Sequence, residues 1–350
     1  MAEVDYHKDL NAKMTIRLRE TIKELPRFVN GFFIALENNT TILTRVNYAS
    51  DLKVFFDFLY AEVPYYSGKD AADLKETDLA AITVDDLYLF MDYLSLYAPD
   101  PESGRYIENH ERGKARKIAC LRSFFKYFYK KSILDKNVCQ LLDTPKLHEK
   151  PIIRLEPEEM TALLDVVEHG EGLSDKQKQY HKRTVVRDMA IIVLFLTTGI
   201  RVSELISLNI RDIDFRNRSF VVTRKGGNRV MLYFDEETEA ALEKYLDERK
   251  VAGTYSLTSP LFLSMQDKRI TVRAVENMVK KYASIAAPLK KISPHKLRST
   301  FGTMLYGETG DIYLVADVLG HKDVNTTRKH YAAMSEDNRR RASKAIKLRK

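Results

Sequence analysis

Residues that together can cut a phosphodiester lie close to one another near the end of this chain. His295 and Arg298 are spaced i and i+3, His321 follows a Leu-Gly pair, and Tyr331 comes shortly afterwards. The planar fork of an arginine holds phosphate through two donors and keeps its charge. A tyrosine oxygen can act as a covalent nucleophile. We interpret this pattern as a site that holds one phosphodiester and attacks it with a phenolic oxygen.

Cleavage of a strand without a metal needs more than a nucleophile. The charge that builds on the non-bridging oxygens must be neutralised, and an acid must protonate the departing 5′-oxygen. Arg201, in the segment Thr198–Leu205, is a candidate second phosphate ligand. Taken singly, such residues are more often surface charges, helix caps or half-buried packing, and the chain has 19 tyrosines. The interpretation therefore depends on their joint order and spacing.

The elements that must position these residues are mostly helices. Apolar residues at helical spacing, with capping residues at the ends, predict helices in the second half of the chain. Because positions i and i+3 share one face of a helix, His295 and Arg298 should point the same way. The helices expected here begin at Pro157 and then cover 187–197, 203–208, 236–250, 271–287, 294–306, 312–319 and 326–334, with a basic helical tail at 338–350.

A small antiparallel sheet interrupts these helices. Alternating residues predict strands at 212–215, 219–223 and 229–234, and Gly226–Asn228 supplies a tight turn between the last two. The polar stretch 170–182 is interpreted as a surface insertion.

The first part of the chain is predicted to be all helical. A break at Pro26 divides 13–36 into two helices. Two prolines in a polar stretch mark 144–156 as a linker. We therefore expect a mainly α protein with two domains, a helical one at 1–143 and a mixed one at 157–350. Further helices are expected at 43–59, from residue 83, at 114–131 and at 135–142.

The helix 114–131 has one apolar face and many basic residues elsewhere. Two interpretations of these basic residues stay open. They form the solvated face of a core helix, or they bind DNA phosphates and displace counterions. The residues alone favour neither. The candidate DNA-binding residues are Arg116, Lys117, Arg122 and Lys126.

Composition narrows the function classes. A formal net charge of +8 favours a polyanionic partner, nucleic acid before membrane. Two cysteines and no signal-like start predict a reduced, cytoplasmic protein, and no apolar run is long enough for a membrane span. No zinc-type cluster and no Walker-type loop appear in the sequence. We expect neither a metal nor a cofactor.

Three boxes, in order, resemble those of the tyrosine recombinases, also called the lambda-integrase family. Thr198–Leu205 is similar to the first-arginine box, Pro294–Arg298 to the His-x-x-Arg box, and Leu319–Tyr331 to the nucleophile box. The last is the most specific. The resemblance covers about residues 155–345 with motifs, and the N-terminal part in its helical character.

The resemblance implies a role for each residue. Arg201 and Arg298 would hold the scissile phosphate, and Tyr331 would attack it to give a 3′-phosphotyrosine and a free 5′-hydroxyl. Lys225 would protonate the leaving oxygen; Arg224 is a rival, but the family's lysine immediately precedes the glycine, as Lys225 does. The remaining roles are proton transfer at the tyrosine for His295, a hydrogen bond to the phosphate for His321, and support of the site for Glu204.

The resemblance also implies a mode of assembly. The helical domain would be a core-binding domain that closes with the catalytic domain around the duplex. Four subunits would act on two DNA sites with paired inverted repeats, and the C-terminal helix would dock on a neighbour. The Xer branch, which resolves chromosome dimers at cell division, is favoured. A phage or transposon integrase, a type IB topoisomerase, a DNA-binding protein without catalysis and a helical RNA-binding protein are the alternatives.

Overall fold

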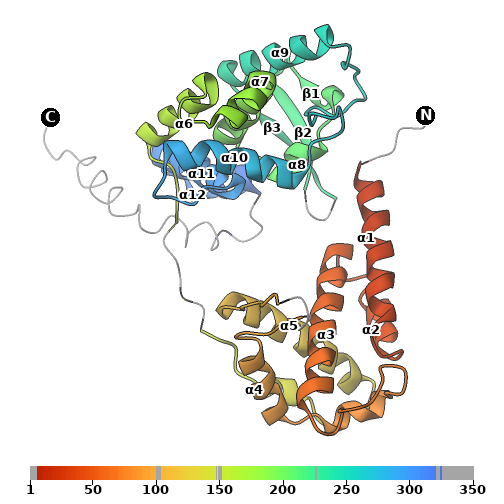
Figure 1. Ribbon diagram of the computed structural model, residues 1–350. Helices are drawn as coiled ribbons and strands as arrows, with labels where there is room; N and C mark the ends of the chain where they lie inside the picture. Colours follow the sequence, from red (N-terminus) through yellow and green to blue (C-terminus); the bar gives the residue numbers. More distant parts are fainter. Residues whose placement is uncertain are drawn as a thin grey trace, which may run out of the picture. The chain divides into compact units, whose positions relative to one another are not determined.

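The computed structural model describes residues 6–99, 104–146, 148, 152–224, 227–320 and 324 (Figure 1). The chain divides into two compact units, 1–149 and 150–350. The division falls inside the segment 144–156 that we predict to be a linker. Among the described residues no helix is both long and apolar enough to cross a membrane.

Unit 1 is built from helices. Pro26 lies between the first two, where a missing backbone N–H would disrupt a continuous helix. The Thr41 hydroxyl accepts a hydrogen bond from the Thr44 N–H, which caps the third helix. The elements are α1 (Tyr6–Lys23), α2 (Val29–Ala35), α3 (Ile42–Glu62), the 3-10 helix η1 (Glu76–Ala81), α4 (Val84–Tyr93), α5 (Glu111–Lys130) and the 3-10 helix η3 (Val138–Gln140).

The core of unit 1 is aromatic. Phenylalanine rings from α2, α3, α4 and α5 meet edge to face, an arrangement that aromatic quadrupoles favour. The helix expected at 135–142 is only the short 3-10 turn η3, because Asn137 directly before it has a non-helical backbone (φ −96°, ψ 85°). The fully buried phenylalanine rings of unit 1 are Phe32, Phe55, Phe56, Phe58, Phe90, Phe124, Phe125 and Phe128.

Unit 2 consists of helices and one small sheet. Its strands run in the order β1-β2-β3, all antiparallel, with Ser219 opposite Tyr233 and Thr223 opposite Arg229. This confirms the predicted class, mainly α with a three-stranded antiparallel sheet. The elements are α6 (Pro157–His169), α7 (Asp175–Thr198), α8 (Val202–Ser207), η4 (Ile210–Asp212), β1 (Ile213–Asp214), β2 (Ser219–Thr223), β3 (Arg229–Tyr233), α9 (Glu236–Val251), α10 (Val272–Ala286), α11 (Pro294–Thr309) and α12 (Ile312–Leu319).

Most residues of the polar stretch 170–182 are exposed, as predicted, but the stretch is not a separate insertion, because α7 begins at Asp175 within it. Ser174 caps α7, whose first turns are polar and run directly into its buried half. His181 is buried, and its Nε2 lies 2.8 Å from the carbonyl oxygen of Val167 on α6. Only residues 170–174 connect the two helices. Pattern alone missed this because the polar turns lack an apolar stripe, and the packing against α6 comes from a histidine.

Several sequence predictions fall outside the described residues. They concern Lys225, His321 and Tyr331, the helix expected at 326–334 and the tail at 338–350. The sites and elements assigned to these residues stay predictions.

Candidate active site

Helix α11 supplies two of the predicted site residues. Pro294 opens the helix, a position where its missing N–H costs nothing. His295 is exposed, whereas Arg298 is 5% exposed. A buried guanidinium must find acceptors, because an unpaired buried charge is costly. Arg298 donates from Nη1 to the carbonyl oxygen of Gly199 and from Nη2 to that of Leu319.

Arg201 stands at the start of the short helix α8. Its Nη1 donates to Glu204 Oε1 at 2.7 Å, and its backbone N–H donates to Glu204 Oε2 at 3.0 Å. Its Nη2 donates to the carbonyl oxygens of Leu319 and Gly320 at 3.0 and 3.1 Å. Glu204 is 3% exposed, so its carboxylate lies inside the protein and orients the guanidinium.

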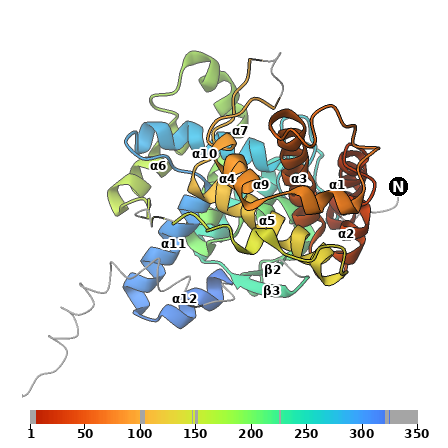
Figure 2. The same ribbon diagram turned by 90° about the horizontal axis from the view of Figure 1, so that it is seen from below.

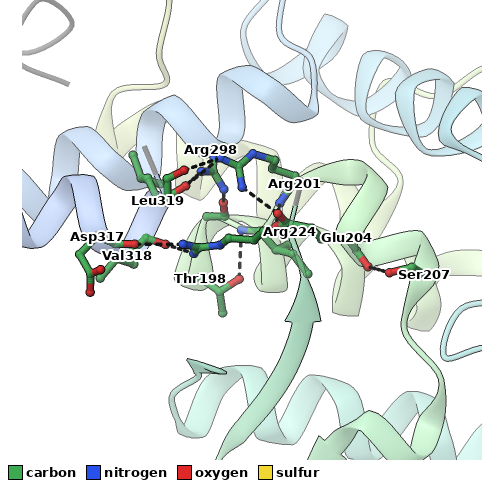
Figure 3. A network of polar contacts seen from close by, with 12 residues as sticks. Thr198, Arg201, Glu204, Ser207, Arg224, Arg298, Asp317, Val318 and Leu319 are labelled. Atoms are coloured by element: carbon green, nitrogen blue, oxygen red, sulfur yellow. Dashed lines mark hydrogen bonds and ion pairs between the residues drawn. The ribbon is translucent and has the colours of Figure 1, made fainter. Parts of the chain in front are cut away.

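Arg201 and Arg298 therefore meet on one atom, the carbonyl oxygen of Leu319, as Figure 3 shows. This oxygen belongs to the last turn of α12, where carbonyls have no partner within the helix and carry partial negative charge. Three segments far apart in the sequence, the α7–α8 junction, α11 and the end of α12, converge here. The first two boxes and the start of the third are thus brought together.

Two glycines allow this convergence. Gly199 ends α7 at φ 59° and Gly320 ends α12 at φ 62°, in the left-handed region. A Cβ on Gly199 would lie 2.3 Å from Cδ1 of Phe301 on α11. A larger residue would therefore separate α7 from α11, and Arg298 would lose its carbonyl.

A third guanidinium, that of Arg224, reaches the same helix end. Its Nη2 donates to the Val318 carbonyl oxygen at 2.7 Å and its Nη1 to that of Asp317 at 3.2 Å. Burial lowers the pKa of Arg224, nearby Glu204 raises it and nearby Arg201 lowers it. Sequence reasoning treated Arg224 only as a rival of Lys225. Nothing in the sequence indicates that its side chain spans from β2 to α12.

The chemistry of this cluster suits an anion. Two guanidiniums of the same charge lie beside one buried carboxylate, which leaves an excess of positive charge. Arginines placed in this way bind phosphate oxygens through several donors. Among the described residues no three His, Cys, Asp or Glu side chains gather as a metal site would require.

The four candidate DNA-binding residues of α5 differ in their surroundings. Arg116 donates to the buried carboxylate of Asp51 and keeps 48% of its side chain exposed. Lys117 is 5% exposed and donates to Asn109, so it has no surface to offer a phosphate. The two others are Arg122, which donates to the Leu142 carbonyl oxygen at 2.6 Å, and Lys126, which is exposed.

The chain resembles known proteins in sequence. The sequence pattern of the phage integrase family matches residues 154–338. Tyrosine recombinase XerC of Caldanaerobacter subterraneus is 35% identical over 291 residues, which cover 80% of this chain and 75% of that protein. Tyrosine recombinase XerC of Syntrophus aciditrophicus is 30% identical over 322 residues, covering 89% of this chain and 93% of that protein.

Solved structures resemble the chain in fold. A XerH site-specific recombinase bound to a palindromic difH substrate superposes with a TM-score of 0.64 at 20% identity, over 87% of this chain and 80% of that chain. A lambda integrase dimer bound to a COC′ core site superposes with a TM-score of 0.60 at 15% identity, over 87% of this chain and 93% of that chain.

Proposed function

This chain belongs to the phage integrase family and is a Xer-like, site-specific tyrosine recombinase, and from that premise we propose how its residues cleave and rejoin DNA. The family membership confirms the resemblance that the three boxes indicate. The observation that carries the proposal is the convergence of Arg201 and Arg298 on the Leu319 carbonyl oxygen. It brings two guanidiniums, the proposed phosphate ligands, to the point where the chain enters the nucleophile box.

In the proposed reaction the Tyr331 oxygen attacks the phosphorus of the scissile phosphate. The bond between phosphorus and the 5′-oxygen breaks, and a 3′-phosphotyrosine forms. The 5′-oxygen takes a proton from Lys225 and leaves as a hydroxyl. His295 transfers the phenolic proton, and His321 donates a hydrogen bond to the phosphate. Attack by a partner strand's 5′-hydroxyl reverses these bonds, so rejoining needs no nucleotide, metal or cofactor.

Arg201 and Arg298 would neutralise the non-bridging oxygens as charge develops on them. Donors fixed in advance serve best, because they need no reorganisation during the reaction. Glu204 supports the proposal, since its buried carboxylate holds the backbone and the guanidinium of Arg201 at once. In the described structure both arginines donate to backbone carbonyls, so DNA must share or replace some of these contacts.

Double-stranded DNA with paired inverted repeats is the proposed substrate, and a homotetramer on two duplexes the proposed assembly. The XerH and lambda integrase structures of similar fold contain DNA, which supports this choice. On α5, exposed Lys126 and half-exposed Arg116 are the proposed phosphate contacts, whereas Lys117 and Arg122 are bound inside unit 1. We propose a cytoplasmic protein, with 1–143 as its core-binding domain, 157–350 as its catalytic domain and a C-terminal helix that docks on a neighbouring subunit.

Chromosome dimer resolution, and with it chromosome partition in the cell cycle, is the proposed process. Relatives named XerC support it over a mobile-element integrase or a type IB topoisomerase. The topoisomerase alternative predicts relaxation of a plasmid that has no target site, without recombinant product.

A nicked suicide substrate tests the nucleophile. Once the short strand beyond the nick is released, the covalent adduct cannot reverse, so the intact protein should accumulate on DNA. Tyr331→Phe should abolish the adduct and leave DNA affinity unchanged, because the ring remains and only the attacking oxygen is lost. Denaturing gels measure the adduct.

Tyr313 offers a matched control on exposed helix surface, since 71% of it is accessible. Tyr313→Phe should form the adduct at the normal rate. An undiminished adduct in the Tyr331→Phe protein would assign the nucleophile to another residue.

A further inference from the structure

We infer that Arg224 is a positioning residue that ties the end of strand β2 to the last turn of α12. The inference rests on the proposed function, in which Lys225 is the acid and α12 leads into the nucleophile box. Arg224 is held at both ends. Its backbone N–H donates to the Asn228 carbonyl oxygen at 2.8 Å, and its guanidinium reaches two carbonyls of α12 (Figure 3).

The backbone contacts make the position of Arg224 dependent on the hairpin. Its carbonyl oxygen also accepts from the Gly227 N–H at 3.0 Å, so the residue closes the end of the β2–β3 ladder. The hairpin and α12 lie side by side in Figure 2 as well. A displacement of the ladder end would therefore move the guanidinium away from α12.

The α12 contacts connect this hairpin to the phosphate-binding arginines. Arg224 binds the carbonyl oxygens of Asp317 and Val318, and Arg201 binds those of Leu319 and Gly320. Four consecutive carbonyls at this helix end are thus shared between guanidiniums, and that of Asp317 also accepts from the Gly320 N–H at 2.8 Å. The hairpin and the first-arginine box therefore bind the same helix end.

The contacts of the Arg224 side chain are those of a tether. Both terminal nitrogens donate to carbonyls of α12, and Nε is buried without a hydrogen-bond partner among the described residues. Arg201 and Arg298 also donate to carbonyls, so a salt series is needed to separate a tether from a phosphate contact at Arg224. A lysine could not replace this arginine, because one ammonium cannot span two carbonyls with the same fixed fork.

The lack of a side chain at Gly320 leaves room for the same contact. A Cβ at this position would lie 2.1 Å from Nη1 and 2.4 Å from Cζ of Arg224. The guanidinium therefore occupies the space that any side chain at this position would need. Gly320→Ala would displace the guanidinium, but it would also strain the backbone at φ 62° and the carbonyl that Arg201 binds, so it does not isolate the tether.

The consequence is a link between the acid and the nucleophile. Lys225 follows Arg224 directly in the chain, and α12 leads to His321 and Tyr331. With the tether in place, the position of the hairpin residue that protonates the 5′-oxygen is fixed relative to the helix end that binds Arg201. Without it, protonation of the leaving group should become slow while attack on phosphorus stays possible.

The test compares two suicide substrates, one with the natural 5′-oxygen and one with sulfur as the bridging atom. A thiolate leaves without protonation because thiols are far more acidic than alcohols. Arg224→Lys should cleave the oxygen substrate about 100-fold more slowly, the scale expected for a misplaced catalytic group. It should cleave the sulfur substrate at the rate of the unchanged protein.

Three companion proteins make the outcome decisive. Arg224→Met should show the same loss and the same rescue, and Arg229→Lys, an exposed arginine on the same hairpin, should behave as the unchanged protein on both substrates. Lys225→Ala tests the proposed function itself: failure of sulfur to rescue it would remove Lys225 as the acid. Rescue of Lys225→Ala but not of Arg224→Lys would overturn the tether alone.

DNA affinity against salt separates the tether from a phosphate contact. The slope of log affinity against log salt should be the same for Arg224→Lys, Arg224→Met and the unchanged protein, because no phosphate contact is lost. A slope reduced by about 0.9 in Arg224→Met, the value for one phosphate contact, would overturn the inference and make Arg224 a DNA ligand. Cleavage of the oxygen substrate by Arg224→Lys at the rate of the unchanged protein would also overturn the inference.

Discussion

Arg201 has partners of two kinds. Its guanidinium donates to the buried carboxylate of Glu204 and to two carbonyls at the end of α12. The carboxylate fixes the orientation of the guanidinium, whereas the carbonyls occupy donors that a bound phosphate would share or take over. At the scale of the single residue, the site is a set of donors whose direction is set before any DNA arrives.

The Glu204–Arg201 pair gives the first prediction. Glu204→Gln replaces one carboxylate oxygen by an amide nitrogen, so one of the two donors of Arg201 loses its acceptor. We expect the free energy of unfolding to fall by about 2 kcal/mol, less than a fully buried pair would lose, because 34% of the Arg201 side chain is exposed. Urea unfolding measures this change.

The same variant should also cleave the suicide substrate more slowly while binding DNA normally. Glu236, paired with Arg218 on the surface, is the matched control, since 80% of its side chain is exposed. Glu236→Gln should change stability by less than about 1 kcal/mol. Equal effects of the two substitutions would show that the Glu204 carboxylate does not orient Arg201.

At the scale of elements, helix α11 connects the site to the start of unit 2. Arg298 points from α11 to the ends of α7 and α12. Two residues further on, the fully buried Thr300 hydroxyl accepts from the Leu155 N–H at 2.9 Å. The segment just before α6 is thereby fixed to the helix that carries Arg298.

This contact gives the second prediction. Thr300→Val keeps the shape of the side chain but leaves the Leu155 N–H buried without an acceptor. We expect a loss of about 1–3 kcal/mol in the free energy of unfolding, the cost of an unsatisfied buried donor. Thermal or urea unfolding measures the loss.

Thr303, on the same helix, provides the opposite case. It is 7% exposed, and its hydroxyl is buried without a hydrogen-bond partner among the described residues. Thr303→Val should therefore be neutral or stabilising. If both substitutions destabilise equally, packing rather than the hydrogen bond to Leu155 determines the effect.

At the scale of the whole molecule, the net charge of +8 is the property that matters for a polyanionic partner. Two of the seven Lys and Arg residues of α5, Lys117 and Arg122, nevertheless bind groups within unit 1. Charge in the sequence is therefore a poor count of the cations that DNA can reach.

The third prediction follows from this difference. The log of DNA affinity should fall linearly with the log of salt concentration, and Lys126→Gln should reduce the slope by about 0.9 because one phosphate contact is lost. Lys117→Met should leave the slope unchanged, since Lys117 is buried. Fluorescence anisotropy over a salt series measures both slopes, and an unchanged slope for Lys126→Gln would remove Lys126 from the proposed phosphate contacts.

The sequence by itself determined the family, the fold class and the three boxes, because these depend on residue type, spacing and local periodicity. The strands and most helices followed from apolar patterns and caps such as Thr41 and Pro157. The true start of α7 had a local signal that the prediction did not use, the capping box of Ser174 and Gln177. The burial of Lys117 could not be read locally, since it depends on partners such as Asp51 that are distant in sequence. The tether of Arg224 to α12 is of the same kind: a long side chain finds its acceptors only after a hairpin and a helix end have packed together.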